Sequence, residues 1–278
     1  MLDDNRDAPT VEGFGDEWTR FDQSAPEPRE LEVMFDQYFA VFPWAALPSD
    51  ARGFDLGCGS GRWAKLAAPR VGELHCIDAS PAALEVARRN LAGFPNCRLH
   101  LASVGDLPIE DASMDFGYSL GVLHHVPDTA RGLRSCTAKL KAGAPFLLYL
   151  YYAFDNRPAW FRALWLASDL LRRLISRTPH AIRFFMSQVL AGLVYYPLAR
   201  MALILERLGI EVSGFPLSTY RNRSFYVMRT DALDRFGTRL EQRFTAQSIR
   251  RMMEDASLER IRFSPTGPFW CAVGFKKG

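Results

Sequence analysis

Residues 53–67 read GFDLGCGSGRWAKLA, in which three glycines fall within five positions directly after a short apolar run. An apolar run that ends in glycines and continues as a helical pattern is typical of a buried strand followed by a tight turn. Glycine is needed where the main chain turns with a positive φ, or where a ligand lies against the backbone without room for a Cβ. The stretch therefore predicts the first strand of a parallel sheet and a ligand-binding turn after it.

The alternation of short apolar runs with helical patterns continues along the chain. We expect strands at GFDLGC, ELHCID, CRLHL, DFGYSLG and PFLLYLYY, and helices between them, one of which is capped by Ser80 with Pro81 at its first position. Such alternation is typical of parallel βαβ units. The predicted fold class is α/β: a doubly wound, mostly parallel, seven-stranded Rossmann-like sheet with an N-terminal helical segment and a helical insertion after strand 5.

The composition disfavours several classes of protein. The 278 residues, 48% of them apolar, can fill one large core, and the 34 basic and 31 acidic residues form no block of like charge that would favour nucleic acid. Five cysteines without a C-x-x-C pair are expected to be reduced thiols, and the polar N-terminus lacks a signal-peptide pattern. The longest uncharged apolar run, 189–199, is too short to span a bilayer. We expect a cytoplasmic protein without a metal site.

The spacing of the glycines distinguishes between nucleotide ligands. A nicotinamide dinucleotide favours G-x-G-x-x-G, whereas Gly57, Gly59 and Gly61 form G-x-G-x-G and are followed by Arg62. Asp78 ends the second predicted strand, where a carboxylate can accept hydrogen bonds from both hydroxyls of a ribose. The glycines alone would suit any tight turn, and Asp78 alone would suit a helix N-terminus. Together they favour a ligand that contains a ribose.

At these residues the chain resembles the class I S-adenosylmethionine-dependent methyltransferases. The resemblance rests on DLGCGSG (55–61), CIDAS (76–80), DLP (106–108) and DFGYSLGVLHHVPD (115–128). The last stretch is similar to the small-molecule branch, which includes enzymes of ubiquinone and menaquinone biosynthesis and sugar and natural-product methyltransferases. The resemblance implies an enzyme that uses S-adenosyl-L-methionine and transfers its methyl group by in-line displacement to a small-molecule acceptor, with a hydroxyl as the expected target.

The resemblance also implies roles for single residues around the cofactor. It places Gly57 and Gly59 beneath the methionine part of the cofactor. Asp78 would bind the ribose, with Ala79 beside the adenine, and the carbonyl of Leu120 would accept a hydrogen bond from the amino group.

One position departs from the family pattern. Where the family commonly has an aspartate near the adenine amino group, this chain has Ser103 followed by Val104, so a hydroxyl would have to accept that hydrogen bond. Arg62 would either pair with the cofactor carboxylate or lie in solvent. The expected cofactor-binding residues are Asp55, Gly57, Cys58, Gly59, Gly61, Arg62, Asp78, Ala79, Ser103, Val104, Leu120 and His125.

The sulfonium methyl is already electrophilic, so the protein does not have to activate it. Methyl transfer to a hydroxyl still needs a base that removes the hydroxyl proton. His124 and His125 follow the fourth predicted strand on the ligand side, and Tyr152 follows the fifth. We expect these three residues to be catalytic, with His125 preferred as the base. The alternative is that the two histidines only shape the loop, with one ring bonded to the backbone and the other closed over the cofactor.

The chain divides into four predicted segments. Residues 1–48 form an N-terminal helical lid segment, 49–156 the cofactor-binding core, 157–215 a helical insertion, and 216–278 the C-terminal completion of the sheet. The insertion lies outside the resemblance and would cap the acceptor pocket, form a homodimer or contact a membrane surface. We expect an apolar or acidic acceptor, no nucleic-acid partner and no transmembrane segment, and leave peripheral membrane contact and a homodimer open.

Other functions remain open from the sequence. Some relatives use the other carbons of the sulfonium, in a cyclisation that releases methylthioadenosine, and the apolar helices could serve a non-catalytic assembly partner. A nucleic-acid base methyltransferase is disfavoured, because SLGVLHHVPD stands where that class has an Asn/Asp-Pro-Pro-aromatic motif.

Overall fold

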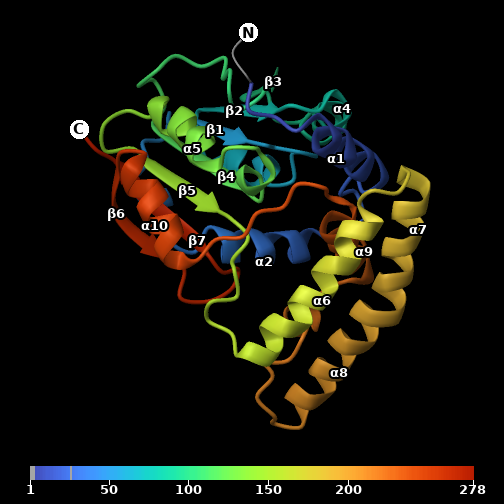
Figure 1. The fold of residues 1–278 in the computed structure, drawn as a ribbon. Coiled ribbons are helices and arrows are strands. Elements are labelled where there is room, and N and C mark those ends of the chain that lie inside the picture. The colour runs from blue at the N-terminus through green and yellow to red at the C-terminus, as the bar shows by residue number, and fades with distance from the viewer. Residues whose placement is uncertain (1–3, 26) are drawn as a thin grey trace. The chain divides into compact units, whose positions relative to one another are not determined.

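A mixed β-sheet forms the centre of the computed structural model, which describes residues 4–25 and 27–278 (Figure 1). The strand order is β3-β2-β1-β4-β5-β7-β6, with β7 antiparallel to its neighbours β5 and β6 and the other pairs parallel. This confirms the predicted doubly wound, seven-stranded sheet. The strands are β1 (Arg52–Leu56), β2 (Glu73–Asp78), β3 (Cys97–Leu101), β4 (Phe116–Leu120), β5 (Pro145–Tyr149), β6 (Leu258–Phe263) and β7 (Cys271–Lys276).

Helices connect the strands and fill the insertion. The α-helices are α1 (Ala8–Arg20), α2 (Pro28–Tyr38), α3 (Ala64–Ala67), α4 (Pro81–Asn90), α5 (Thr129–Ala138), α6 (Ala159–Ile175), α7 (His180–Leu190), α8 (Tyr196–Arg207), α9 (Phe225–Gly237) and α10 (Ala246–Asp255). Short 3-10 turns are η1 (Trp44–Ala46), η2 (Ala68–Arg70), η3 (Leu123–His125) and η5 (Ser218–Tyr220), and the π-helical segment η4 (Ala191–Tyr195) joins α7 to α8.

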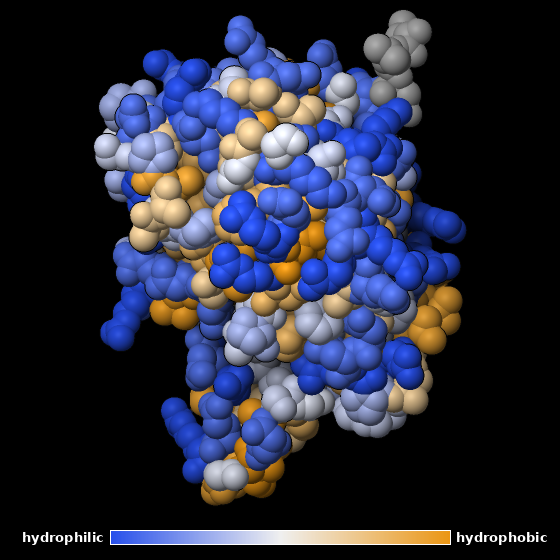
Figure 2. All heavy atoms as spheres, turned by 90° about the vertical axis from the view of Figure 1, so that its left-hand side faces the viewer, coloured by the Kyte–Doolittle hydropathy of each residue, from blue (hydrophilic) through white to orange (hydrophobic). Residues whose placement is uncertain are grey.

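The chain forms two compact units. The first contains residues 1–23, 31–153 and 240–278, and therefore the whole sheet, whereas the second contains residues 24–30 and 154–239. We call the second the helical unit. Figure 1 draws the loop after α8 at the bottom of the view. At the same height, the lower end of Figure 2 shows hydrophobic side chains on the surface.

The helical unit extends further than the segment 157–215 expected from the sequence. Helix α9 belongs to it, because Met228, Ala232 and Phe236 pack in one buried cluster with Ala191 and Tyr195. The completion of the sheet accordingly begins at Leu240, later than the expected residue 216.

Capping residues fix where the helices of the first unit begin. Ser80 caps α4, with Pro81 as its first residue, and Asp128 and Thr245 cap α5 and α10. A side-chain cap contributes about 1 kcal/mol by satisfying an otherwise unpaired backbone N–H. Because α4 and α5 begin just after β2 and β4, their first turns lie at the carboxyl edge of the sheet, where ligands bind in such folds.

Complementary glycines and phenylalanines hold the two central strands together. Gly53 lies opposite Phe116, and Phe54 lies opposite Gly117, in the pairing of β1 with β4. A Cβ on Gly53 would fall 2.2 Å from the Phe116 ring, and a Cβ on Gly117 would fall 2.4 Å from the Phe54 ring. Each ring therefore fills the space that a side chain on the opposite strand would need.

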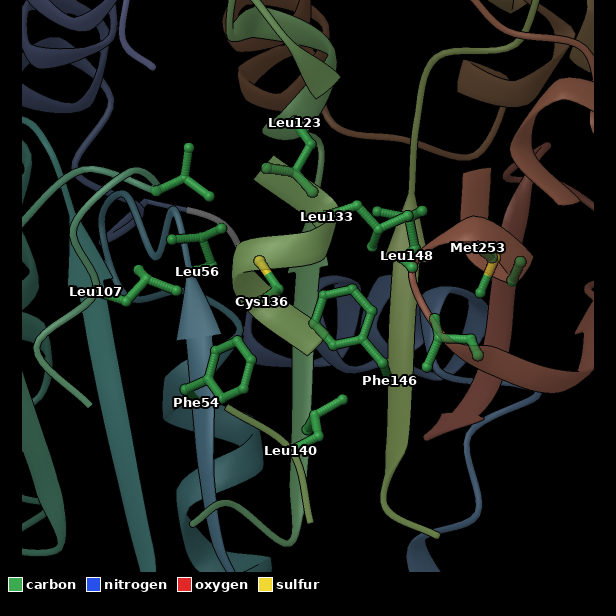
Figure 3. Packing of buried hydrophobic residues seen from close by; sticks show 14 of the residues in the cluster. Phe54, Leu56, Leu107, Leu123, Leu133, Cys136, Leu140, Phe146, Leu148 and Met253 are labelled. Atoms are coloured by element: carbon green, nitrogen blue, oxygen red, sulfur yellow. The ribbon is translucent and has the colours of Figure 1, made fainter. Parts of the chain in front are cut away.

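One face of the sheet is covered by α5 and α10 (Figure 1). Figure 3 shows Leu133 and Cys136 of α5 over Phe54 and Phe146, with Met253 of α10 over β7. Burial of such side chains stabilises the fold by about 1.5–3 kcal/mol each.

Aromatic residues that follow α2 cover the opposite face. The Phe39 ring lies 5.1 Å from Tyr118, and the Phe42 ring lies 6.0 Å from Phe116. The two faces are thus closed by different parts of the chain, which leaves the carboxyl ends of the strands as the place for a ligand.

Candidate active site

The glycine turn after β1 has the conformation that the sequence predicted. Gly57, Gly59 and Gly61 have φ values of 74°, 55° and 77°, a region that residues with a Cβ rarely adopt. A Cβ on Gly59 would fall 2.7 Å from Nε1 of Trp18, and a Cβ on Gly57 would fall 2.2 Å from the Val122 side chain. The turn is therefore bare backbone, and an indole from α1 lies directly against it.

Asp78 connects the end of β2 to the glycine turn. Its Oδ2 accepts a hydrogen bond of 2.9 Å from the Gly59 N–H, and its Oδ1 accepts one of 2.8 Å from the Ser80 N–H. Burial raises the pKa of Asp78, and hydrogen bonds from the backbone N–H groups of Ser80, Gly59 and Ala79 oppose that shift. The structure thus brings together the carboxylate and the glycines that the sequence singled out.

Asp55 and Cys58 lie deeper than the other residues of the turn. Burial raises the pKa of Asp55 to about 8, although the neighbouring Tyr118 side chain lowers it. Burial also raises the pKa of the Cys58 thiol, because only 3% of the surface of this residue is exposed. Burial therefore favours the neutral form of both groups, so we read them as support for the turn.

Arg62 lies between two aromatic rings. Its guanidinium carbon is 5.1 Å from the centre of the Trp18 ring and 4.5 Å from that of Trp63. Cation–π contacts of this kind contribute about 0.5–1 kcal/mol at partly exposed sites. Arg62 therefore holds the α1 indole over the glycine turn, an arrangement that neither alternative from the sequence described.

The chain before α1 is attached to the far end of the same edge. The Asp4 carbonyl accepts hydrogen bonds from the Ser103 hydroxyl at 2.7 Å and from the Gly105 N–H at 3.2 Å. The side chain of Asn5 both donates to the Asp128 carbonyl and accepts from the Asp128 N–H, at 2.8 and 2.9 Å. The Ser103 hydroxyl proton is thereby used, and its oxygen can still accept a hydrogen bond.

The remaining expected cofactor residues lie around these groups. Gly61 faces Leu91, which a Cβ would approach to 3.0 Å, and Ala79 lies between Asp78 and the cap of α4. Leu120 is the last residue of β4, and Val104 is buried in the core beside α5. All of them belong to the first unit, at or next to the carboxyl ends of β1 to β4.

His125 is held in one orientation by a distant part of the chain. Its Nδ1 lies 2.6 Å from the Leu240 carbonyl oxygen. Because a carbonyl can only accept, Nδ1 carries the proton and Nε2 carries the lone pair of the neutral ring. The Phe14 ring of α1 lies 5.0 Å from the imidazole. The hydrogen bond to Leu240 therefore fixes which nitrogen of the ring is basic.

His124 has a different environment from its neighbour. It is fully buried, and neither ring nitrogen has a hydrogen-bond partner in the part of the chain that the structure describes. Burial lowers the pKa of His124 well below its usual value, and the nearby His125 and Arg243 lower it further. Its ring packs 3.9 Å from Tyr151. His124 is therefore a neutral packing group, and His125 is the histidine that the structure orients.

The structure places Tyr151, and not Tyr152, next to the two histidines. The Tyr151 ring lies 5.5 Å from His125, whereas the Tyr152 ring packs 5.8 Å from Phe269 and 6.3 Å from Trp270. Side chains along an extended segment alternate in direction, so Tyr151 shares the side of Tyr149 at the end of β5. This alternation can be read from the sequence, and it could have favoured Tyr151 over Tyr152 as the neighbour of the histidines.

The sequence did not indicate the segment that holds the histidine loop. The Gln242 N–H donates to the His124 carbonyl at 3.0 Å, and its side-chain amide donates to the Val126 carbonyl at 2.7 Å. The Leu240 carbonyl orients His125 in the same stretch. These residues lie more than a hundred positions away in the chain and carry no local motif.

The geometry fits an adenosylated ligand. Backbone without Cβ atoms lines the turn after β1, and a carboxylate at the end of β2 lies within hydrogen-bond distance of that turn. A carboxylate offers about four acceptor sites, and the backbone N–H groups of Gly59, Ser80 and Ala79 do not use all of them, so the carboxylate can still accept from a ribose hydroxyl.

Comparisons with known proteins agree with this geometry. A family model described as a methyltransferase domain matches residues 54–148. The ubiquinone biosynthesis O-methyltransferase of Xanthomonas oryzae pv. oryzae is 30% identical over 183 residues, which cover 65% of this chain and 72% of that protein. The protein of the same name from Xanthomonas axonopodis pv. citri is 29% identical over 189 residues, covering 66% and 74%.

A solved structure supports the fold over nearly the whole chain. The S-adenosylmethionine-dependent methyltransferase of Aquifex aeolicus superimposes with a TM-score of 0.51 at 12% identity and covers 92% of this chain and 96% of its own. With the sheet order, the glycine turn and the sequence relatives, the conclusion is direct: the chain belongs to the class I S-adenosylmethionine-dependent methyltransferases and is an enzyme of that family.

Proposed function

We propose that this enzyme methylates a hydroxyl group of a small-molecule acceptor and that His125 is the base. The observation that carries the proposal is the contact of 2.6 Å between Nδ1 of His125 and the Leu240 carbonyl, which leaves Nε2 as the acceptor of a proton. The names of the Xanthomonas relatives, which pair O-methylation with ubiquinone biosynthesis, support oxygen as the attacking atom.

The cofactor would be held by the residues around the glycine turn. Gly57 and Gly59 would lie against its methionine part and Asp78 would bind its ribose, while the Leu120 carbonyl and Ser103 would accept from its two amino groups. When bound, S-adenosyl-L-methionine supplies a methyl group that is electrophilic because it is attached to a sulfonium. Catalysis then depends on the position of the acceptor and on removal of its proton.

His125 is suited to that proton transfer. The Leu240 carbonyl accepts from Nδ1 and stabilises the imidazolium that forms when Nε2 takes up a proton. The rings of Phe14, His124 and Tyr151 surround the imidazole and reduce its access to water. His124, whose pKa is lowered by burial, adds no charge beside it.

The segment from Asp4 to the end of α1 would act as a lid over the cofactor. Trp18 lies against Gly59, Phe14 lies beside His125, and Asn5 binds Asp128, so one continuous stretch covers this edge of the sheet. Cofactor exchange would require Trp18 to move from Gly59. The proposal also places the enzyme in the cytoplasm, in keeping with five cysteines that are all free thiols.

Product analysis tests this function. The purified enzyme is incubated with S-adenosyl-L-methionine and a phenol that bears an apolar chain, and the products are identified by mass spectrometry. We expect the methyl ether and S-adenosylhomocysteine in equal amounts, and no turnover of the same compound once its hydroxyl has been methylated. Methylthioadenosine without a methylated product, or methylation of amines in preference to a range of phenols, would contradict the proposal.

A further inference from the structure

Exposed apolar side chains are concentrated on the helical unit. In the part of the chain that the structure describes, all of the exposed large hydrophobic residues except Val33 and Leu101 lie between Trp160 and Phe225. Among them are Leu174, Leu193 and Leu208, with 69%, 75% and 70% of their surface exposed. Clusters of exposed apolar side chains on a protein surface mark an interaction site.

These residues are not exposed because the helical unit lacks a hydrophobic core of its own. The inner faces of the same helices are already buried, because Ile175, Ala191, Tyr195 and Ala199 pack in one cluster with α9. The outer faces repeat at helical spacing: Ile182, Phe185, Leu193, Ile204 and Leu208 along α7 to α8, and Leu164, Leu170, Leu171 and Leu174 along α6. The buried sides of α6 and α7 also contain polar residues such as Arg172 and Arg183, whereas the outer sides of these helices are apolar and uncovered.

Charge favours an anionic partner for this surface. Residues 154–239 contain 13 arginines, no lysine and six acidic residues, a formal charge of +7 in a chain whose total is +3. Arg162 on α6 and Arg207 on α8 are exposed, as is Arg177 in the turn after α6, whereas Arg172 is buried in an ion pair with Asp169. A second copy would bring like charge against like charge, which opposes self-association through this surface.

The helix 180–207 is better suited to lie on a bilayer than to cross it. It is the one helix of the described chain that is long and apolar enough to span a membrane, with a mean hydropathy of 1.5 and only 22% of its apolar window buried. However, it packs against α9, which carries Arg229, Asp231, Asp234 and Arg235. Crossing the membrane would take these charges into hydrocarbon, at a cost of several kcal/mol.

We propose that the helical unit binds the surface of an anionic lipid bilayer. The outer apolar faces of α6 and of α7 to α8 enter the interfacial layer, and exposed arginines such as Arg162 and Arg177 contact lipid phosphates. This inference is independent of the catalytic proposal, because it rests on residues of the helical unit alone. It provides a route by which a membrane-dissolved acceptor is reached.

Vesicle flotation of the full chain tests the proposal. We compare vesicles of phosphatidylcholine and phosphatidylglycerol with vesicles of phosphatidylcholine alone, and expect binding to the former that weakens as salt is raised. The variants Leu170→Glu/Leu174→Glu and Leu193→Glu/Leu208→Glu should each bind about tenfold more weakly. Because these side chains are exposed, thermal unfolding should match that of the wild-type protein.

Two further variants test whether binding depends on the helical unit itself and on its arginines. Val33→Glu/Leu101→Glu changes two exposed apolar residues outside the helical unit by the same charge and should bind like the wild type. Arg162→Gln/Arg177→Gln should weaken binding to the anionic vesicles by about tenfold and flatten its salt dependence.

Three results would overturn the proposal: no flotation of the wild type with anionic vesicles, an equal loss in the Val33/Leu101 control, or a concentration-dependent dimer in sedimentation that the Leu193/Leu208 variant abolishes.

Discussion

The Nδ1 atom of His125 lies 2.6 Å from the carbonyl oxygen of Leu240, a residue 115 positions further along the chain. This contact fixes the tautomer of the ring and directs Nε2 away from the carbonyl. The adjacent His124 has neither a fixed tautomer nor a polar partner among the residues described. Of the two neighbours in the motif LHH, therefore, only His125 has a nitrogen fixed as the proton acceptor.

Replacement of His125 should remove the base and leave the cofactor site intact. For His125→Asn we expect kcat to fall by about 10²–10⁴-fold, the usual contribution of a positioned base. His124→Phe, which keeps a ring against Tyr151, should retain kcat within about tenfold. Equal activity of His125→Asn and the wild type would refute the assignment of the base.

His124 should make the stability of the fold depend on pH. Burial lowers the pKa of His124 in the folded protein, so below the usual histidine pKa of about 6.5 the unfolded chain binds a proton that the folded chain does not. The free energy of unfolding should therefore fall as pH decreases below about 6.5, by up to about 1.4 kcal/mol per pH unit from this group.

Urea denaturation of the wild type and His124→Phe at several pH values isolates that contribution. Burial also lowers the pKa values of His75 and His100, so both proteins lose stability in acid. The difference between the two curves should nevertheless widen in favour of the variant as pH falls. Parallel curves would show that His124 is protonated without cost in the folded state.

Gly59→Ala should damage both the fold and the cofactor site. The positive φ of 55° costs a residue with a Cβ about 1–2 kcal/mol, and the new methyl group would fall 2.7 Å from Trp18 Nε1. Denaturant unfolding should show that loss of stability, and calorimetry should show weaker binding of S-adenosylhomocysteine. Gly93→Ala is the matched control, because no atom lies within 4 Å of its added Cβ.

Removal of the indole separates the two effects at Gly59. In Trp18→Ala/Gly59→Ala the steric conflict is gone and the backbone strain remains, so the double variant should recover only part of the stability lost through the glycine substitution. Full additivity of the two substitutions would mean that Trp18 does not lie against the turn.

Local chemistry made much of the core predictable. Strand and helix periodicity, the cap Ser80 and the G-x-G-x-G spacing each act over a few residues, and the structure confirms the sheet that they predicted. The orientation of His125 by Leu240 could not be predicted, because the contact joins segments that only the closed sheet brings together.

Other features were missed for comparable reasons. Helix α9 joins the helical unit through Met228, Ala232 and Phe236, whose partners are known only once α7 and α8 are folded. The stacking of Arg62 between Trp18 and Trp63 likewise depends on where α1 lies. The preference for Tyr151 over Tyr152 is different, since the alternation along β5 was available in the sequence.

The central claim is that the glycine turn and Asp78 hold the cofactor, and calorimetric titration tests it most directly. The purified protein is titrated with S-adenosyl-L-methionine and with S-adenosylhomocysteine, alongside Asp78→Asn and the exposed control Glu85→Gln on α4. We predict micromolar binding of both ligands by the wild type and the control, and binding at least about tenfold weaker by Asp78→Asn, which loses a charge-assisted acceptor. A folded wild type that gives no heat with either ligand, or an Asp78→Asn variant that binds both as tightly as the wild type, would contradict the account.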